Sequence, residues 1–236
     1  MDRIRAGFQN ARWSVREATW PRRCAGCGMR GTWACQDCQD RHPLWSPPWC
    51  PRCGSPLGVG CLCDDVPIAV DAARSAGRYE QWLESSIHQM KYSRESARAA
   101  YLGSLLVQPL DDLPPPDFVI SVPLHPRRLQ QRGYNQSQLI AQALVHETGW
   151  NIEEGIVTRI VDTPPQVRMR HDERLANMRA AFAINDSDVP RNAHVLIVDD
   201  VLTTGATTGE IARMLRAAGA CRIDVATVAR AFPDRR

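Results

Sequence analysis

Residues Val195 to Thr207 read V-L-I-V-D-D-V-L-T-T-G-A-T, and this stretch predicts a strand, a turn and a helix in that order. Four apolar residues suit a short buried strand, and the threonine- and glycine-rich turn after the two aspartates opens a helix at about Thr207. In α/β proteins, ligands bind at the carboxyl end of such a strand. Amide groups at the helix start suit a phosphate, and the adjacent carboxylates of Asp199 and Asp200 suit the paired hydroxyls of a ribose.

Other loops that bind phosphate fit this stretch poorly. A Walker A loop needs Gly-Lys-Ser/Thr, which is missing, and the G-x-G-x-x-G of dinucleotide-binding proteins is absent as well. An acidic pair at the end of a strand could also do no more than cap the following helix. As a whole, however, the stretch resembles the fingerprint with which type I phosphoribosyltransferases bind phosphoribosyl diphosphate (PRPP).

The chain around this stretch predicts an α/β domain. A helix from Thr208 to Ala218 ends at Gly219 and leads to a last strand, Ile223–Val228, so that two parallel strands are joined by a right-handed crossover. Apolar patterning upstream predicts helices at 80–91, 94–108 and 136–146 and strands at 118–122 and 155–160, and a polar, arginine-rich segment covers 163–180.

Eight of the nine cysteines lie close together near the N-terminus, in the order C-x2-C, C-x2-C, C-x2-C, C-x-C. Two thiolates that flank a tight turn point at one ion, and Zn²⁺ accepts four of them in a tetrahedron. The count therefore predicts two structural zinc sites with four cysteines each. Sequential pairing closes shorter loops than a cross-braced arrangement and is favoured, although the entropy difference is modest. The eight expected ligands are Cys24, Cys27, Cys35, Cys38, Cys50, Cys53, Cys61 and Cys63.

Composition predicts the domain boundaries and excludes some classes of function. We expect a leader segment at residues 1–21, a double zinc ribbon at 22–66 and the α/β domain at 67–236, and we expect loss of a zinc site to unfold the ribbon and leave the α/β core largely intact. The formal charge of +3 becomes about −1 once eight thiolates and two Zn²⁺ are counted, so charge alone does not indicate a nucleic-acid-binding protein. No apolar run reaches the roughly 18 residues of a membrane span, and the N-terminus lacks the pattern of a signal peptide, which predicts a cytoplasmic protein.

Three further stretches resemble the ComF family of competence-associated proteins, as does the zinc ribbon before them. They read H-Q-M-K-Y (88–92), S-V-P-L-H-P-R-R-L-Q-Q-R-G-Y-N-Q (121–136) and D-T-P-P-Q-V…R-H-D-E-R-L-A-N-M-R-A-A-F (162–182). The resemblance covers about residues 21–230. It implies a type I phosphoribosyltransferase fold, which is a mostly parallel sheet flanked by helices.

The resemblance also implies a PRPP site. Asp199 and Asp200 would hold the ribose hydroxyls, the loop that begins at Val122 would meet the pyrophosphate, Mg²⁺ would accompany PRPP, and segment 163–180 would close over the site as a flap. Lys91 would lie near the cleft, and as the only lysine beside 28 arginines it suits a crowded place where a guanidinium does not fit. The other expected contacts are Thr203, Thr204, Gly205, Ala206 and Thr207 for the 5′-phosphate, Leu124 and His125 for the pyrophosphate, and Arg168, Arg170, Arg174 and Arg179 in the flap. The alternatives are a purely structural role for His125 and a solvated charged loop for the arginines.

Two functional classes follow from the resemblance. The ComF family implies a PRPP-binding protein that acts in uptake of single-stranded DNA during natural transformation, with single-stranded DNA and other DNA-uptake proteins as partners. The alternative is an enzyme that transfers the phosphoribosyl group from PRPP to a base or an amine, and no segment identifies its acceptor. Trp33, Trp45 and Trp49 either form the small core of the ribbon or stack with single strands. Cys221 is expected to be a buried, inert thiol rather than a nucleophile.

Overall fold

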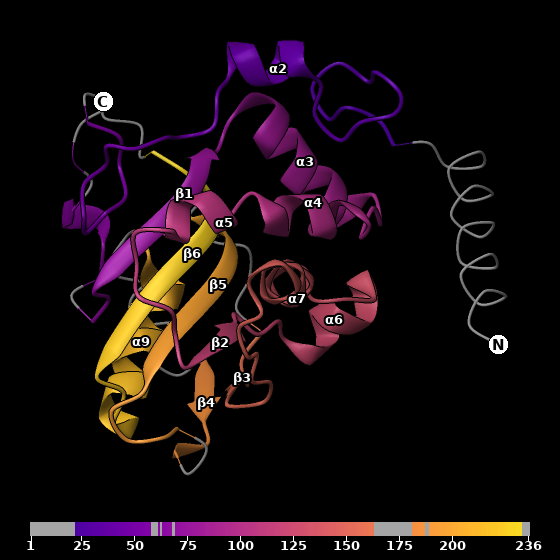
Figure 1. Cartoon of the computed structure of the whole chain (residues 1–236). Coiled ribbons are helices and arrows are strands. Elements are labelled where there is room, and N and C mark those ends of the chain that lie inside the picture. The colour runs from indigo at the N-terminus through magenta and orange to yellow at the C-terminus, as the bar shows by residue number, and fades with distance from the viewer. Residues whose placement is uncertain are drawn as a thin grey trace, which may run out of the picture.

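A four-stranded parallel sheet forms the centre of the computed structural model, with the strand order β1-β6-β5-β2 (Figure 1). The structure describes residues 22–57, 61, 63–67, 69–162, 181–186 and 189–232. The helix α9 joins the two central strands β5 and β6, which confirms the predicted parallel α/β architecture. The bounds of these elements are Ala72–Arg78 for β1, Phe118–Ser121 for β2, His194–Leu202 for β5, Ala206–Ala218 for α9 and Arg222–Arg230 for β6.

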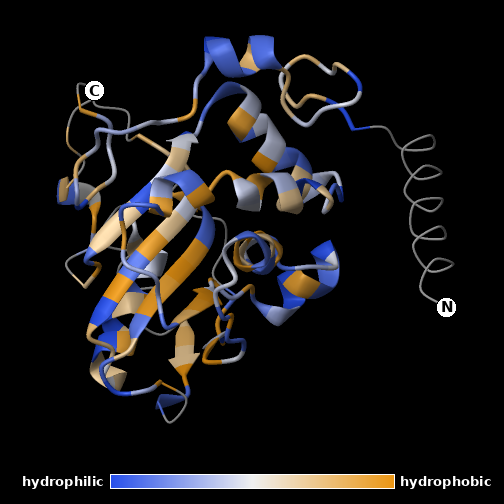
Figure 2. Ribbon diagram, viewed as in Figure 1, coloured by the Kyte–Doolittle hydropathy of each residue, from blue (hydrophilic) through white to orange (hydrophobic). Residues whose placement is uncertain are grey.

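The sheet separates two hydrophobic cores, because successive side chains of a strand point to opposite faces. Val195 and Ile197 of β5 pack into the core that α9 covers. Leu196 and Val198 pack into the other core, beneath the helices α3 (Gln81–Tyr92), α4 (Arg98–Ser104) and α7 (Gln136–Thr148). Figure 2 shows hydrophobic residues along the central strands, as expected for a parallel sheet that is covered on both faces.

The remaining elements are short and surround the sheet. Two of them, β3 (Val157–Arg159) and β4 (Phe182–Ile184), pair antiparallel in a separate small sheet. The others are α2 (Gln36–Arg41), the 3₁₀ turn η1 (Cys63–Asp65), α5 (Val107–Leu110) and α6 (Pro126–Arg132). None of the described helices is both long and apolar enough to cross a membrane.

The helix predicted at 94–108 is wrong in its extent. Arg94 has a φ of +58°, a left-handed conformation that ends helical backbone, and α4 begins only at Arg98. At the other end, the Ser104 hydroxyl donates to the carbonyl of Tyr101 at 2.8 Å, and α4 ends there. A separate short helix, α5, follows after two residues.

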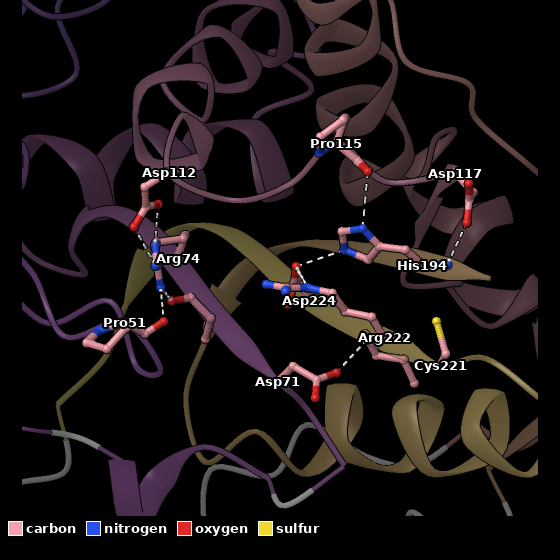
Figure 3. Close-up of polar contacts among 12 residues, drawn as sticks. Pro51, Asp71, Arg74, Asp112, Pro115, Asp117, His194, Cys221, Arg222 and Asp224 are labelled. Atoms are coloured by element: carbon pink, nitrogen blue, oxygen red, sulfur yellow. Dashed lines mark hydrogen bonds and ion pairs between the residues drawn. The ribbon is translucent and has the colours of Figure 1, made fainter. Parts of the chain in front are cut away.

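The strand β1 was not predicted, because A-A-R-S-A-G-R has neither the branched apolar residues nor the alternation of a strand. Arg74 lies in it and is only 1% exposed. Its guanidinium donates to both carboxylate oxygens of Asp112, at 3.1 and 2.8 Å, and to the carbonyl of Pro51 at 2.9 Å (Figure 3). These bonds satisfy the buried charge, and the bond to Pro51 also fixes the second half of the zinc ribbon to the edge of the sheet.

The two halves of the zinc ribbon pack on opposite faces of the sheet. Cys24, Cys35 and Cys38 belong to the core under α3 and α4, whereas Cys53 belongs to the core under α9. At the second half, a Cβ on Gly54 would lie 2.5 Å from the carbonyl oxygen of Ala73 in β1, so only glycine permits this approach. Both halves of the zinc ribbon therefore pack into the hydrophobic cores of the α/β domain.

Polar contacts hold the amino ends of β5 and β6 together (Figure 3). The aspartate pair lies toward the opposite, carboxyl end of β5. His194 lies between the carbonyl of Pro115, 3.2 Å from Nδ1, and Asp224 Oδ2, 2.8 Å from Nε2. Burial raises the pKa of Asp224, but hydrogen bonds from His194 and Arg222 outweigh burial, and the pKa is lowered. Asp224 is thereby kept ionised in the interior.

Candidate functional site

The aspartate pair lies where the sheet is open on one side. Pairing between β5 and β2 ends at Val198, while pairing between β5 and β6 continues to Leu202. The strand is therefore longer than predicted, and Asp199 and Asp200 lie within β5 just beyond the carboxyl end of β2. This position agrees with the rule that ligands of α/β sheets bind at carboxyl ends.

Asp199 is held by its own neighbours. Its Oδ1 accepts hydrogen bonds from the hydroxyl of Ser137 at 2.7 Å and from the backbone N–H of Asp200 at 2.8 Å. Burial, followed by the charge of Asp200, raises the pKa of Asp199 to about 7, against the opposing effects of Ser137 and Lys91. The carboxyl group therefore changes its charge near neutral pH.

Asp200 is 4% exposed and accepts a hydrogen bond from Lys91 at 2.8 Å. Burial lowers the pKa of Lys91, but the charge and the hydrogen bond of Asp200 outweigh burial, and the pKa is raised. Lys91 is therefore a partly buried cation that reaches the predicted ribose site from the last turn of α3. The second oxygen of Asp200, Oδ2, is buried and has no hydrogen-bond partner within the described part of the chain. A buried acceptor of this kind indicates a missing donor.

The turn after β5 leaves the first amides of α9 open. Gly205 adopts a left-handed φ of +70° at the N-cap, a conformation that favours glycine. No side chain caps this helix, and the hydroxyl of Thr208 donates instead to the carbonyl of Gly205 at 3.2 Å. The predicted phosphate residues Thr203, Thr204, Ala206 and Thr207 are exposed or half-buried around these amides. The helix start can therefore receive an anion.

The predicted pyrophosphate loop follows β2. The N–H of Val122 donates to the carbonyl of Val198 at 3.0 Å, and Asn135 donates to the carbonyl of Val122 at 3.0 Å. The first bond places the start of the loop beside β5, and the second ties it to the N-cap of α7. His125 caps α6, where its Nδ1 accepts from the N–H of Arg127 at 3.3 Å. Leu124 lines a pocket of about 260 Å³ next to β3, and neither aspartate lines that pocket.

The structure thus brings together Lys91, both aspartates and the start of α9. Arg168, Arg170, Arg174 and Arg179 lie outside the described residues. Sequence reasoning missed Ser137, which is 1% exposed and holds Asp199. It follows Asn135, the N-cap of α7, in the first turn of a predicted helix. The signal in the sequence that could have identified Ser137 is a hydroxyl in the first turn of this helix, close to the loop that follows β2.

The eight cysteines form the two predicted groups of four, paired in sequence order. Within each group all sulfur atoms lie within 4.8 Å of one another. Separations include 3.7 Å for Cys24–Cys35 and 3.5 Å for Cys50–Cys63. Four thiolates around Zn²⁺ at about 2.3 Å have sulfur atoms roughly 3.8 Å apart. The arrangement fits two structural Zn²⁺ ions, and it confirms sequential pairing rather than a cross-brace.

The tryptophans of the ribbon are packed. Trp45 is buried and meets Phe232 edge-on, with ring centroids 6.1 Å apart. The guanidinium of Arg98 lies 4.6 Å from the ring centroid of Trp33, and that of Arg74 lies 5.9 Å from that of Trp49. These contacts favour the core interpretation over the stacking surface. The prediction that Cys221 is buried is wrong: its thiol is exposed just before β6, where it donates to the carbonyl of Asn192 at 2.9 Å, and it belongs to neither cysteine group.

Comparison with known proteins agrees with this arrangement. Residues 15–67 match the family model of a double zinc ribbon domain, and residues 129–235 match that of a phosphoribosyl transferase domain. The DNA utilization protein YhgH of Salmonella typhi is 37% identical over 187 residues, which cover 75% of this chain and 81% of that protein. Competence protein F of Haemophilus influenzae is 32% identical over 211 residues, which cover 84% and 90%. Competence protein ComFC of Streptococcus pneumoniae is 24% identical over 191 residues, which cover 79% and 82%. The chain therefore belongs to the ComF family, in which a double zinc ribbon precedes a phosphoribosyltransferase domain.

Proposed function

We propose that this protein binds PRPP at the carboxyl end of β5 and acts in the uptake and use of single-stranded DNA. The observation that carries the PRPP site is the carboxylate pair, with a buried and unpartnered oxygen on Asp200, shortly before an uncapped helix start. The role in DNA uptake is supported by the relatives named for competence and DNA utilization.

The carboxylates suit the two ribose hydroxyls of PRPP. Each hydroxyl is a hydrogen-bond donor, and an ionised carboxylate offers acceptors only. Asp199 Oδ1 already accepts two bonds and Asp200 Oδ1 accepts one from Lys91. Asp200 Oδ2 accepts no hydrogen bond within the described part of the chain, and a ribose hydroxyl would supply the missing donor.

The two anionic ends of PRPP meet different groups. The 5′-phosphate would bind the open amides and threonine hydroxyls at the start of α9. The pyrophosphate would lie between the loop 122–125 and Lys91, whose ammonium neutralises part of its charge. Mg²⁺ would arrive with PRPP and bind its phosphate oxygens, with His125 and Leu124 at the margin of this region.

Phosphoribosyl transfer is the second candidate, and the match to a phosphoribosyl transferase domain favours it. In that reaction the bond from C1 of the ribose to pyrophosphate breaks, a bond from C1 to a nitrogen of the acceptor forms, and the acceptor loses a proton. Release of pyrophosphate from PRPP, measured with single-stranded DNA, bases and amines as acceptors, distinguishes a transferase from a binding protein.

Calorimetric titration with PRPP in the presence of Mg²⁺ tests the site. We expect one PRPP per chain for the parent protein and loss of binding for Asp199→Asn combined with Thr204→Val. The matched control is Asp111→Asn, which removes an exposed carboxylate after α5 and should leave the affinity unchanged. PRPP binding that is unaltered in the double variant would refute the site.

A further inference from the structure

Tyr92 is exposed beside the aspartate pair. It is the last residue of α3, and 67% of its surface is exposed. Among the described residues no other Phe, Tyr or Trp side chain is exposed. An aromatic ring left in water at a single place next to a proposed ligand site is a candidate contact surface.

The ring has a planar neighbour and a cationic one. His88 lies one turn earlier in α3, with its ring centroid 4.6 Å from that of Tyr92. The guanidinium carbon of Arg132, at the end of α6, lies 5.7 Å from the Tyr92 ring centroid. We define Tyr92, His88 and Arg132 as the aromatic platform. Two elements that are distant in sequence therefore build one surface.

The platform is linked to both aspartates by adjacent residues. Lys91, next to Tyr92, donates to Asp200. Arg132 donates to the side-chain oxygen of Gln136, and the following residue, Ser137, donates to Asp199. The aromatic platform therefore lies beside the proposed ribose site.

The charge around the platform is positive. Arg132 donates to an amide oxygen, that of Gln136, rather than to a carboxylate, and within the described ranges neither it nor Arg94 forms an ion pair. Glu95, which follows Arg94, is occupied by Arg98 at 2.6 Å. The guanidinium of Arg132 beside an exposed ring, with Arg94 two residues after Tyr92 in sequence, suits a ligand that combines planar rings with phosphates.

We propose that the aromatic platform stacks a base of single-stranded DNA, while Arg132 and Arg94 contact the adjoining phosphates. Nucleic-acid single strands are bound in this way, by aromatic faces set among cations. The inference rests on the proposed function, because a strand handled by this protein would then present its base next to the PRPP site. It also moves the stacking surface from the packed tryptophans of the zinc ribbon to the phosphoribosyltransferase domain.

Fluorescence anisotropy with two labelled strands of equal length tests the platform. One strand is oligo-dT, and the other carries the same phosphates on abasic sugars. Tyr92→Ala should weaken binding of oligo-dT at least fivefold, which corresponds to the lower end of base–aromatic stacking energies, and should leave the abasic strand unaffected. Tyr92→Trp should restore binding of oligo-dT. Leu57→Ala, which removes a side chain of similar exposure (68%) from the zinc ribbon, is the matched control and should change neither affinity.

Arg132→Gln should weaken the binding of both strands and reduce the dependence of that binding on salt, because the variant removes a phosphate contact. If Tyr92→Ala weakens the binding of both strands equally, or of neither, the proposed platform is wrong. It is also wrong if a free nucleoside monophosphate competes as strongly as the strand. PRPP titrations of Tyr92→Ala are read separately and should match the parent protein. Failure of the PRPP site would appear there and not in the comparison of the two strands.

Discussion

Lys91 Nζ donates a hydrogen bond to Asp200 Oδ1 at 2.8 Å, across 109 residues of sequence. The bond ties the last turn of α3 to β5, and the side chains are only 21% and 6% exposed. Neither charge is well solvated, so each depends on the other. The single lysine of the chain is therefore both a structural partner of the aspartate pair and a cation at the proposed PRPP site.

Removing either partner should destabilise the protein. We expect Lys91→Met and Asp200→Asn each to lower the free energy of unfolding by about 3 kcal/mol, because each leaves an uncompensated buried charge. The double variant should lose clearly less than the sum of the two, since neither member of the ion pair is then left without its partner. Urea unfolding of the four proteins measures the coupling. Additive losses would show that the contact contributes nothing to stability.

Lys91→Arg should weaken PRPP binding although the charge is kept. A guanidinium is planar and forked, whereas the ammonium is compact, and the space between Asp200 and the incoming pyrophosphate suits the latter. We expect the affinity to fall at least tenfold, or about 1.4 kcal/mol, in calorimetric titrations.

Arg94→Lys is the matched control for that variant. It makes the reverse exchange two residues after α3, at a residue that contacts neither aspartate in the described structure. PRPP affinity should then change little. Equal affinity of Lys91→Arg and the parent protein would mean that the single lysine is an accident of composition.

PRPP binding should strengthen as the pH rises through about 7, the pKa to which burial and Asp200 raise Asp199. Ribose hydroxyls donate hydrogen bonds, so they bind the carboxylate and not the protonated acid. Affinity should fall by up to about tenfold per pH unit below 7, since one unit corresponds to 1.36 kcal/mol. The stability of the protein should depend on pH in the opposite direction. Because the pKa of Asp199 is higher in the folded than in the unfolded protein, its contribution to the free energy of unfolding is present at low pH and is lost as the pH rises through 7.

Asp199→Asn isolates this effect from titration of PRPP itself. The variant cannot ionise at this position, so its weaker affinity should lose the part of the pH dependence that comes from the protein. Titrations at pH 6, 7 and 8 for both proteins provide the comparison. Parallel pH profiles would assign the dependence to the ligand and not to Asp199.

The sequence predicted the central strand and its helix well because their signals are local. Four apolar residues, two aspartates and a glycine-rich turn placed β5 and α9 within a few residues of their observed bounds. The extension of β5 to Leu202 was not predictable, because it depends on pairing with β6, as in the register Leu202↔Arg230. The aspartates consequently lie inside the ladder, and Asp200 is more buried than the motif suggests.

Strand β1 illustrates a second limit. An arginine in this position would be expected at the surface from sequence alone. Its burial is tolerated because it donates to the distant carboxylate of Asp112 and to the carbonyls of Pro51 and Ala73. Ser137 is similar, because its role depends on Asp199, which is 62 residues away in sequence. Residues whose function is to satisfy a distant buried group give no periodic signal.

Metal analysis should find two zinc ions per chain, and loss of one should affect the whole molecule. Cys53 is 2% exposed and lies in the same core as Ile223 and Val225 of β6, so the second zinc module is part of the sheet's packing. We therefore expect Cys50→Ser to lower the melting temperature of the entire chain in a single transition, and not to unfold an isolated ribbon as the sequence suggested.

Cys221→Ser is the control, because this exposed thiol lies outside both groups of four. It should keep two zinc ions and melt like the parent protein. For Cys50→Ser, elemental analysis should give one zinc ion, and calorimetry should show one transition at lower temperature, because loosening the second module exposes β1 and the core under α9 together. Two separate transitions, with the upper one unchanged from the parent, would show instead that the ribbon folds independently of the phosphoribosyltransferase domain.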